Sequence, residues 1–500
     1  MIRFMLIGLL VVTISAARGD TRLRSPLGGI RAQDSASLAG QRGGPTTEAK
    51  PGPFAVRNVT VIPATGGPPL KAMTVLVRDE SIAAIGPADQ TEIPPGARVI
   101  DGSGKFLLPG FIELHAHLSK ARASALGLFV ANGVTTLRDM GGDHEELLRW
   151  RREVQGGKRV GPRILMAGPY LESTRNLERM RKDPPEERIE PFERTRIPVG
   201  SPEEARRIVA SLASRELDFL KIRTVQDRET YLALNEAANT HGIPLVGHVA
   251  GIPPEVVLDA GQDGAEHPFY PSVEGKPREE RLAVWRRFAQ RGVPIVPTLV
   301  TLFEATFPST DRLRAIVDDS DGRIDPRRAY LSKYMVLDWR EQVLEATDQR
   351  RQALRRIWED VIRRDLREMH EAGMDVLVGT DVAVVNVYPG FSLHDEMALF
   401  VAELGMTPAQ VIERATRRSA RFMRLGDSVG TVERGKVADL VLLDADPLQD
   451  IRNTRRIAAV VLRGALYDRE GLERIRAAVR AAPDRQTDDW GRAAEKRKNE

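Results

Sequence analysis

The sequence predicts an α/β fold: a (β/α)8 TIM barrel flanked by a discontinuous β-sandwich domain built from an N-terminal and a C-terminal segment. Three observations lead to this prediction. Short strands bounded by glycine and proline fill residues 54–108, and eight apolar strands alternate with helical stretches over 109–425. Strand-like sequence then returns over 426–470. These last strands are too few to form a domain alone, so we expect them to pair with the first segment.

Residues 109–425 carry the alternation of strand and helix that a barrel requires. The helical stretches include 228–242 and 201–216, where Ser201 is a good N-cap and Pro202 takes the first helical position. Eight strands with intervening helices is the number found in a TIM barrel. The candidate strands are, in chain order, GFIELHAH, VTTLRDM, RILMAG, DFLKIR, IPLVGHV, GAEHP, VPIVPTL and DVLVGTD.

Two insertions interrupt this alternation. Residues 173–200 are charged and contain prolines, and residues 303–365 are helical and rich in arginine and glutamate. Both follow candidate strands, so in a barrel they should lie over the carboxyl ends of the strands, where barrel enzymes bind their substrates.

The N-terminus has the three parts of a secretory signal peptide. Arg3 precedes an apolar stretch, and small residues follow it up to Ala17, so residues 1–17 are expected to be cleaved off. A retained anchor is the alternative, but the stretch is short of the roughly 20 residues that span a bilayer, so no membrane span is expected after cleavage. Residues 18–50 read as a disordered linker, and residues 471–500 as a C-terminal helix and charged tail.

The composition limits which binding partners and which cellular location can be expected for this protein. Apolar residues make up 42% and charged residues 29% of the 500, as in ordinary globular proteins. The net charge of +4 is too small for a nucleic-acid-binding surface, and the chain contains no cysteine. The signal peptide and the lack of cysteine together predict a periplasmic or extracellular protein. A small-molecule substrate is the expected partner, and a homo-oligomer is left open.

Histidines gather at the ends of candidate barrel strands, where the catalytic groups of barrels collect. The chain has only eight. His115 and His117 lie two residues apart on a strand, so their side chains share one face, while His248 and His267 end two later strands. Taken alone, the pair could be structural, and a single histidine at such a place is more often a hydrogen-bonded core residue. Their recurrence on several strands favours a metal site.

Two further polar residues hold equivalent positions. Asp381 ends the eighth strand, which lies beside the first in a barrel, although alone it would be read as a helix N-cap. Lys221 should point inward from DFLKIR, where an unpaired ammonium is costly. Burial lowers the pKa of a lysine, and the neutral amine can react with carbon dioxide to give a carbamate able to bridge two metals. In isolation, Lys221 at the rim or paired with Asp218 is the simpler reading.

These six positions resemble the ligand set of the amidohydrolase superfamily of metal-dependent hydrolases. The motif HAH is similar to its first-strand HxH and LKI to its bridging lysine. The phrases GKFLLPGFIELHAHL and GTVERGKVADLVLLDADPL resemble its entry into the barrel and its closing β-segment. Within the superfamily, GVTTLRDMGG and GPRILMAGPYL resemble the imidazolonepropionase-related and Xaa-Pro dipeptidase-like branch. The resemblance extends from about residue 54 to about residue 470.

The resemblance implies a site for two divalent metal ions. Ligands of nitrogen and oxygen suit zinc best, and also manganese, cobalt or iron. It also implies hydrolysis, in which a hydroxide shared by the metals attacks an amide-type carbonyl and Asp381 carries the proton to the leaving nitrogen. The implied ligands are His115, His117 and Asp381 for one ion, His248 and His267 for the other, and carboxylated Lys221 as the bridge.

The expected activity is that of an exported binuclear amidohydrolase acting on a dipeptide of the Xaa-Pro kind or an N-acyl amino acid. Arg223 is a candidate for gripping a substrate carboxylate, or else a rim residue paired with an acid. Tyr231 and Arg138 are further candidates for substrate binding.

Three alternatives stay open. A cyclic amide or lactone hydrolase, or a deaminase, could use the same metal core, and a non-catalytic exported binding protein is the third. Deaminases of this superfamily usually work with one metal and do not need the bridging lysine, so Lys221 favours a two-metal hydrolase.

Overall fold

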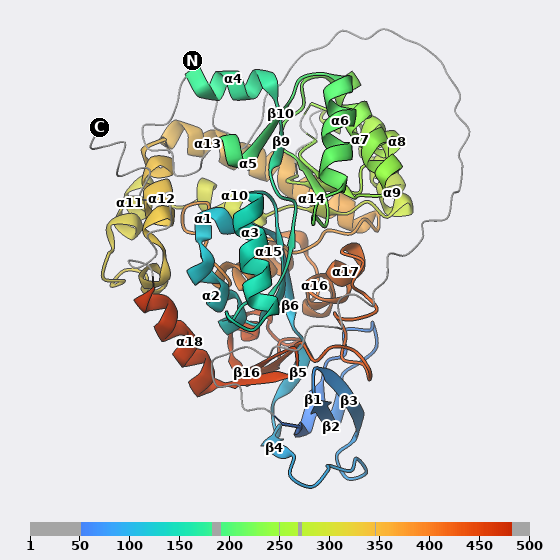
Figure 1. The fold of residues 1–500 in the computed structure, drawn as a ribbon, viewed down its shortest axis with the longest axis vertical. Coiled ribbons are helices and arrows are strands. Elements are labelled where there is room, and N and C mark those ends of the chain that lie inside the picture. The colour runs from blue at the N-terminus through green and yellow to red at the C-terminus, as the bar shows by residue number, and fades with distance from the viewer. Residues whose placement is uncertain (1–51, 183–191, 250, 269–272, 346, 483–500) are drawn as a thin grey trace.

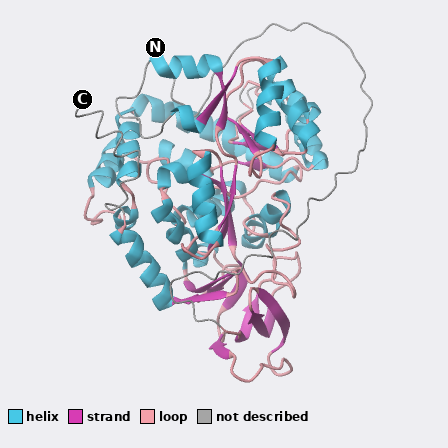
Figure 2. Cartoon of the chain, in the orientation of Figure 1, coloured by secondary structure: helices cyan, strands magenta, loops and turns pink. Residues whose placement is uncertain are grey.

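A computed structural model describes residues 52–182, 192–249, 251–268, 273–345 and 347–482. A mixed, mostly antiparallel sheet occupies one end of the molecule, and a larger part follows in which helices surround parallel strands (Figure 1). Figure 2 shows this contrast, with the strands enclosed by helices over most of the molecule. The expected signal peptide, linker and charged tail lie outside the described residues. None of the helices in the described part of the chain has the length and apolarity that crossing a lipid bilayer takes.

The N-terminal and C-terminal segments pair in one eight-stranded sheet. Its order is β17-β16-β15-β5-β1-β2-β3, with β4 paired to β1. The two segments join where β5 and β15 run antiparallel, with Leu107 opposite Leu442. The strands are β1 (Phe54–Val61), β2 (Leu70–Arg78), β3 (Ser81–Pro87), β4 (Arg98–Asp101), β5 (Phe106–Pro109), β15 (Leu440–Leu443), β16 (Ile457–Leu462) and β17 (Ala465–Asp468).

This sheet, called the curled sheet below, bends over a core of its own. At its β3 edge, Ile82 donates its N–H to the carbonyl of Lys436 and accepts from the N–H of Gly435, both at 2.9 Å. Strands of both segments bury apolar side chains in one cluster, because a strongly twisted sheet can close over a single apolar face. That cluster includes Phe54, Val59, Val75, Leu107, Leu440, Leu442 and Val461.

Gly110 alone separates the curled sheet from the first parallel strand. A Cβ atom at this position would lie 2.2 Å from Oγ1 of Thr135, so only glycine allows the two strands to approach this closely. The Gly110 N–H donates to the carbonyl of Asp439 at 2.8 Å, which ties the junction to the C-terminal segment.

Nine parallel strands form two sheets, ordered β6-β7-β8 and β10-β9-β11-β12-β13-β14. Seven of the eight expected barrel strands are present, as β6, β7, β8, β11, β12, β13 and β14. The strands are β6 (Phe111–Ala116), β7 (Val134–Asp139), β8 (Arg163–Met166), β9 (Tyr170–Ser173), β10 (Arg196–Val199), β11 (Leu220–Ile222), β12 (Leu245–Gly247), β13 (Gly264–Glu266) and β14 (Ile295–Val296).

The eighth expected strand, 375–381, is extended but not a regular strand. Leu377 donates its N–H to the carbonyl of Ile295 in β14 at 2.8 Å, and Asp381 donates to the carbonyl of His115 in β6 at 2.7 Å. The segment therefore lies between β14 and β6, the place the eighth strand of a barrel would take. Its ladder is reduced to isolated bridges at Val376 and Val382, so the described strands do not form one uninterrupted ring.

Strands β9 and β10 fall in or beside the 173–200 insertion, where no strand was expected. β10 contains Pro198, which argues against a strand when read from sequence alone. The proline is tolerated because β10 is the edge strand of its sheet.

Helices cover the parallel strands, with α6 to α9 on one side and α11 and α12 on another (Figure 1). The expected cap of α6 is present, since Ser201 accepts a hydrogen bond from the N–H of Glu204 at 3.2 Å. The longer helices are α3 (His144–Gln155), α4 (Thr174–Lys182), α6 (Pro202–Ala213), α7 (Arg228–His241), α9 (Arg278–Arg291), α10 (Leu299–Thr306), α11 (Thr310–Asp318), α12 (Lys333–Glu345), α13 (Asp348–Ile357), α14 (Arg363–Glu371), α15 (Phe391–Leu404) and α18 (Arg469–Ala481). The shorter ones are α1 (Leu118–Ala121), α2 (Leu126–Ala131), α5 (Phe192–Thr195), α8 (Pro254–Ala260), α16 (Pro408–Arg414) and α17 (Arg417–Phe422).

Candidate metal centre

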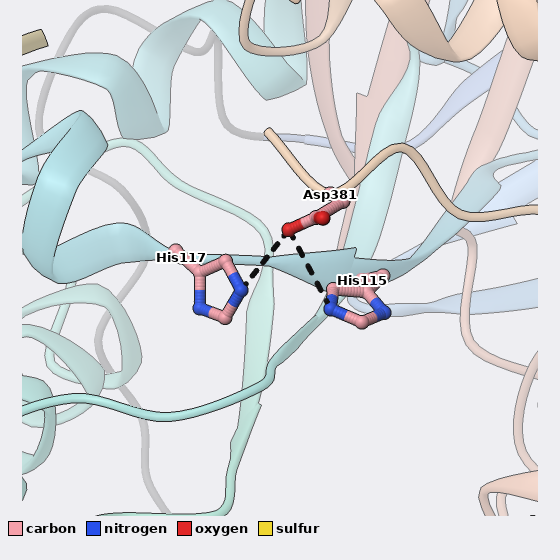
Figure 3. A group of neighbouring side chains, drawn as sticks. All are labelled: His115, His117 and Asp381. Atoms are coloured by element: carbon pink, nitrogen blue, oxygen red, sulfur yellow. Dashed lines mark ion pairs between the residues drawn. The ribbon is translucent and has the colours of Figure 1, made fainter. Parts of the chain in front are cut away.

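His115, His117 and Asp381 meet at the carboxyl end of β6. Nε2 of His117 lies 3.1 Å from Oδ1 of Asp381, and Nε2 of His115 lies 3.6 Å from the same oxygen (Figure 3). One ligand atom from each residue falls within 4.8 Å of the others. Two imidazole nitrogens and a carboxylate oxygen at this spacing could hold one divalent cation.

A buried glutamate fixes this arrangement from below. Glu113, two residues before His115, accepts hydrogen bonds from the N–H groups of His115 and Thr380, both at 2.9 Å. Asp381 follows Thr380 directly and adopts a left-handed backbone with φ of 56°. This conformation is unfavourable for a non-glycine residue and persists only where the surroundings impose it.

The other two expected histidines lie beside the first pair. The ring centroids of His115 and His267 are 5.0 Å apart, and those of His248 and His267 are 4.9 Å apart. Four imidazole rings from β6, β12 and β13 therefore lie in succession, in the order His117, His115, His267, His248.

Gly247 brings His248 into this row. A Cβ atom at Gly247 would lie 2.1 Å from the carbonyl oxygen of Ile222, and its φ of +141° is in a region that side chains disfavour. The backbones of β12 and β11 therefore come into contact here, and His248 lies next to the strand that carries Lys221.

Three of the four histidines hold their Nδ1 atoms in hydrogen bonds to side chains of other strands or strand ends. A histidine that binds metal through one ring nitrogen usually gives the other to such a partner, which fixes the tautomer. Nε2 is then free to bind metal, and in His115 and His117 it is the atom that faces Asp381. The pairs are His115 with Glu266 at 2.8 Å, His117 with Tyr170 at 2.9 Å and His267 with Thr298 at 2.8 Å.

The protonation states also suit metal binding. Burial, together with the charge of Lys221, lowers the pKa of His115 to about 3, and burial lowers the pKa of His267 to about 4 and holds that of His248 well below its usual value. Burial alone would raise the pKa of Asp381, but His115 and His117 hold it well below its usual value. At neutral pH these three histidines are therefore neutral and the aspartate is ionised, which are the forms that bind metal.

Lys221 in β11 is 1% exposed, and its Nζ has no hydrogen-bond partner among the described residues. Burial lowers the pKa of this amine to about 8, although Glu266 and Asp381 act in the opposite direction. A buried polar atom without a partner needs an explanation. The donor set around it, nitrogen and oxygen without sulfur, fits divalent metal ions, and a carbamate on Nζ would give the orphaned amine a role as a ligand.

Glu266 lies in the candidate metal centre, although the sequence analysis did not single it out. Its carboxylate lies between Nδ1 of His115 and Nη2 of Arg138, at 2.8 and 2.6 Å. Burial opposes its ionisation, but the ion pair with Arg138 and the hydrogen bond from His115 lower its pKa to about 2. Strand alternation should turn adjacent residues to opposite faces, but the left-handed backbone of His267 (φ 63°) lets both it and Glu266 lie near His115. The signal that could have pointed to Glu266 is a charged residue in the short, buried strand β13.

Arg138 holds a different position from the one expected for a substrate-binding residue. It is 2% exposed, and its Nε donates to the carbonyl of Leu114 at 2.6 Å while the same guanidinium pairs with Glu266. Its charge is thus already neutralised inside the protein. From this buried position Arg138 orients Glu266.

Tyr231 is also not where the sequence analysis placed it. It lies in α7, is fully buried, and donates its hydroxyl to Oε1 of Gln262 at 2.8 Å. The helical period turns it toward the layer between helix and strands, so it contributes to packing and not to substrate binding.

Arg223 keeps a partly exposed position next to the histidines. Its side chain is 36% exposed, its Nε lies 3.6 Å from Glu172, and its guanidinium is 5.5 Å from the ring of Tyr170, the partner of His117. Arg196, which the sequence did not single out, stacks on the same ring at 5.1 Å. Two arginines and a tyrosine therefore line one side of the metal centre.

This chain resembles known proteins over most of its length. The model of the Amidohydrolase family matches residues 106–466, which is more than half of the chain. An imidazolonepropionase from Symbiobacterium thermophilum is 24% identical over 428 residues, or 80% of this chain and 91% of that protein. Other curated relatives match over short stretches, and the chain covers only 12% and 21% of the length of two of them.

Solved structures show the same fold. A Bifidobacterium longum protein provisionally described as a prolidase is 25% identical with a TM-score of 0.63, and the likeness covers 85% of this chain and 98% of that one. A Xaa-Pro dipeptidase with methionine bound in its active site has a TM-score of 0.58 over 83% of this chain and 100% of its own. Its identity of 19% makes this a likeness of fold alone.

Proposed function

Because the chain belongs to the amidohydrolase family, we propose that it is a metal-dependent hydrolase that cleaves an amide-type carbon–nitrogen bond. One observation carries the proposal: histidines, an aspartate held ionised and a buried lysine whose Nζ has no hydrogen-bond partner among the described residues gather at the ends of the parallel strands. The likeness to an imidazolonepropionase and to a prolidase-like protein supports this class of reaction.

We infer that the parallel strands close into a (β/α)8 barrel. The hydrogen bonds of residues 375–381 to both β14 and β6 support this inference, as does the succession of strand and helix. In a closed barrel the metal centre would lie inside the ring at its carboxyl end, where catalytic groups of barrel enzymes gather.

The proposed centre holds two divalent cations, with zinc as the first choice. Bound cations would polarise a carbonyl and lower the pKa of a water molecule. His115, His117 and Asp381 fit one cation, since their ligand atoms already lie together. His248 and His267 would serve the second, with carboxylated Lys221 between the two.

Side chains of this protein would transfer the proton and orient the histidines. Asp381 is held ionised, so it can accept a proton from the attacking water and pass it to the leaving nitrogen. Glu266 and Tyr170 orient His115 and His117 through their Nδ1 atoms, which keeps both Nε2 atoms aimed at the same point.

We propose a substrate with a free carboxylate, such as a dipeptide of the Xaa-Pro kind or an N-acyl amino acid. Arg223 is the proposed anchor, because it is charged, partly exposed and stacked on the tyrosine that contacts His117. A cyclic amide or lactone hydrolase, or a deaminase, is the competing activity, and the orphaned Lys221 favours the two-metal hydrolase.

Export to the periplasm or the exterior is proposed from residues 1–17. N-terminal sequencing of the protein recovered from outside the cytoplasm should begin after Ala17. A first residue of Met1 would contradict the cleavage.

The test of the proposed function combines metal analysis with a substrate panel. The wild-type protein should contain about two metal ions per chain, and Lys221→Ala should lose metal and activity together. Lys158→Ala, which changes an exposed lysine, is the matched control and should keep both. The panel contains Xaa-Pro dipeptides, N-acyl amino acids, hydantoins and lactones. Unchanged metal content in Lys221→Ala would contradict the bridge, and a panel without turnover would contradict the hydrolase.

A further inference from the structure

The loop that follows Asp381 is held by helices of the 303–365 insertion. Asn386 donates its side-chain amide to Oε2 of Glu304 in α10 at 2.6 Å. Gln342 in α12 makes two contacts with the loop backbone. Its Oε1 accepts from the N–H of Val385 at 2.9 Å, and its Nε2 donates to the carbonyl of Ala383 at 3.1 Å.

The primary amide of Gln342 thus pairs with the loop as a neighbouring strand would. Its donor and acceptor each meet the complementary backbone group, so the amide has only one favourable orientation. That orientation is set again by Asp338, one helical turn earlier in α12, whose Oδ2 accepts from the same Nε2 at 2.8 Å.

Asp338 connects this network to the other half of the metal centre. Both of its carboxylate oxygens lie 3.4 Å from Nζ of Lys120, three residues after His117. One insertion helix therefore contacts the segment after His117 and the segment after Asp381. Nε2 of His117 and Oδ1 of Asp381 lie 3.1 Å apart.

The loop needs such support. Asp381 and Asn386 both adopt left-handed backbone conformations, with φ of 56° and 65°. The strained conformation of Asp381 persists only where surrounding contacts impose it. Without Gln342, the carbonyl of Ala383 and the N–H of Val385 would lose their partners at a partly buried place, and the loop would relax to find others.

We propose that Gln342 is a positioning residue that sets the orientation of Asp381 through this loop, so that the 303–365 insertion is part of the catalytic centre. The effect on turnover rests on the proposed function of Asp381. The effect on metal coordination rests on its proposed role as a metal ligand, and the effect on the loop rests on neither.

The experiment compares Gln342→Leu with Gln352→Leu, which changes an exposed glutamine of the neighbouring helix α13. Gln342→Leu should lower kcat about 10- to 100-fold with KM changed less than about 3-fold, because it misplaces a catalytic group without touching a substrate contact. It should also speed amide hydrogen exchange of a peptide covering 382–390. In the cobalt-substituted protein, it should change the visible absorption that reports the geometry around the metal. The control should match the wild type in all three measurements.

Gln342→Met provides a second test that also serves if the leucine variant does not fold. Its unbranched side chain occupies nearly the same space but makes none of the hydrogen bonds to Val385, Ala383 and Asp338, so its effects should have the same direction. A folded variant at position 342 with normal hydrogen exchange and a normal cobalt spectrum would overturn the proposal. If the enzyme showed no turnover on any substrate, these two measurements would still decide it.

Discussion

The curled sheet and the metal centre are both buried, but they bury different groups. The core of the sheet consists of apolar side chains such as Val59, Leu107 and Leu440, all fully buried. The metal centre buries charges and potential charges instead: His115, Lys221 and Glu266 are each 2% exposed or less.

This difference separates stability from activity. Apolar burial stabilises the fold in proportion to the area removed from water. Burial of ionisable groups opposes folding unless each finds a partner, and Nζ of Lys221 has no hydrogen-bond partner among the described residues. The sheet should therefore determine how stable the protein is, and the metal centre what it does, so substitutions in the two regions should have separable effects.

The largest expected effect comes from Asp381→Asn. The amide keeps one oxygen near His117 but cannot accept and pass on a proton, so turnover should fall by about 10³-fold or more. Metal content and the thermal unfolding temperature should stay close to those of the wild type. Steady-state kinetics and metal analysis check this, and near-normal turnover would remove Asp381 from its proposed role.

Leu107→Ala tests the other side of the comparison. It leaves a cavity in the centre of the curled sheet, so the free energy of unfolding should fall by about 2–5 kcal/mol. The kcat should be unchanged at temperatures where the variant is folded. Denaturant unfolding measures the loss of stability. The control is Leu70→Ala, which should lower the free energy of unfolding only slightly because Leu70 is 40% exposed. A drop in kcat would show that the two regions are coupled.

A pH dependence should come from Glu113 below the metal centre. Burial raises its pKa from 4.5 to about 7, against the hydrogen bonds that it accepts. The folded state therefore holds a proton that the unfolded state releases between these values. In the metal-free protein, the contribution of this proton to the free energy of unfolding is fully present below pH 4.5. It is lost as the pH rises to about 7, by at most about 1.4 kcal/mol per pH unit.

Glu113→Gln removes this titration. The slope of unfolding free energy against pH should become flatter between pH 4.5 and 7 in chelator-treated samples. An unchanged slope would mean that Glu113 is ionised in the folded protein.

The smallest expected effect is that of Arg98→Ala at the edge of the curled sheet. Arg98 pairs with Asp468 at 3.2 Å, but both side chains are at least 40% exposed, so solvent screens the pair. The free energy of unfolding should change by less than about 1 kcal/mol. A larger loss in denaturant unfolding would mean that this pair, which links the two chain segments, matters more than its exposure suggests.

Much of the metal centre could be predicted because its residues carry local signals. His115, His117 and His248 follow apolar strands, and strand alternation is enough to direct the first two to one face. Tyr231 and Arg138 were misplaced because a sequence does not show which partner a buried polar side chain has already met. Tyr231 meets Gln262, 31 residues away, and Arg138 meets Glu266, 128 residues away.

The fold, too, could be predicted from the sequence only in part. The strands of both β-segments and seven parallel strands follow from alternation and turn residues, because these patterns are local. The way the sheet of the β-segments curls depends on how the edge at Ile82 meets Lys436, a contact between residues 354 apart that no local pattern encodes. The irregular eighth segment likewise depends on its neighbours β14 and β6.

By itself, the sequence determined which side chains can bind metal and that they lie at the ends of strands, because residue type and strand period are local properties. Only the tertiary structure decided what those side chains meet. It placed Glu266 behind His115, gave Nζ of Lys221 no hydrogen-bond partner among the described residues and put Gln342 against the loop after Asp381. These contacts join segments far apart in the chain, and their geometry is set by the packing of the whole fold.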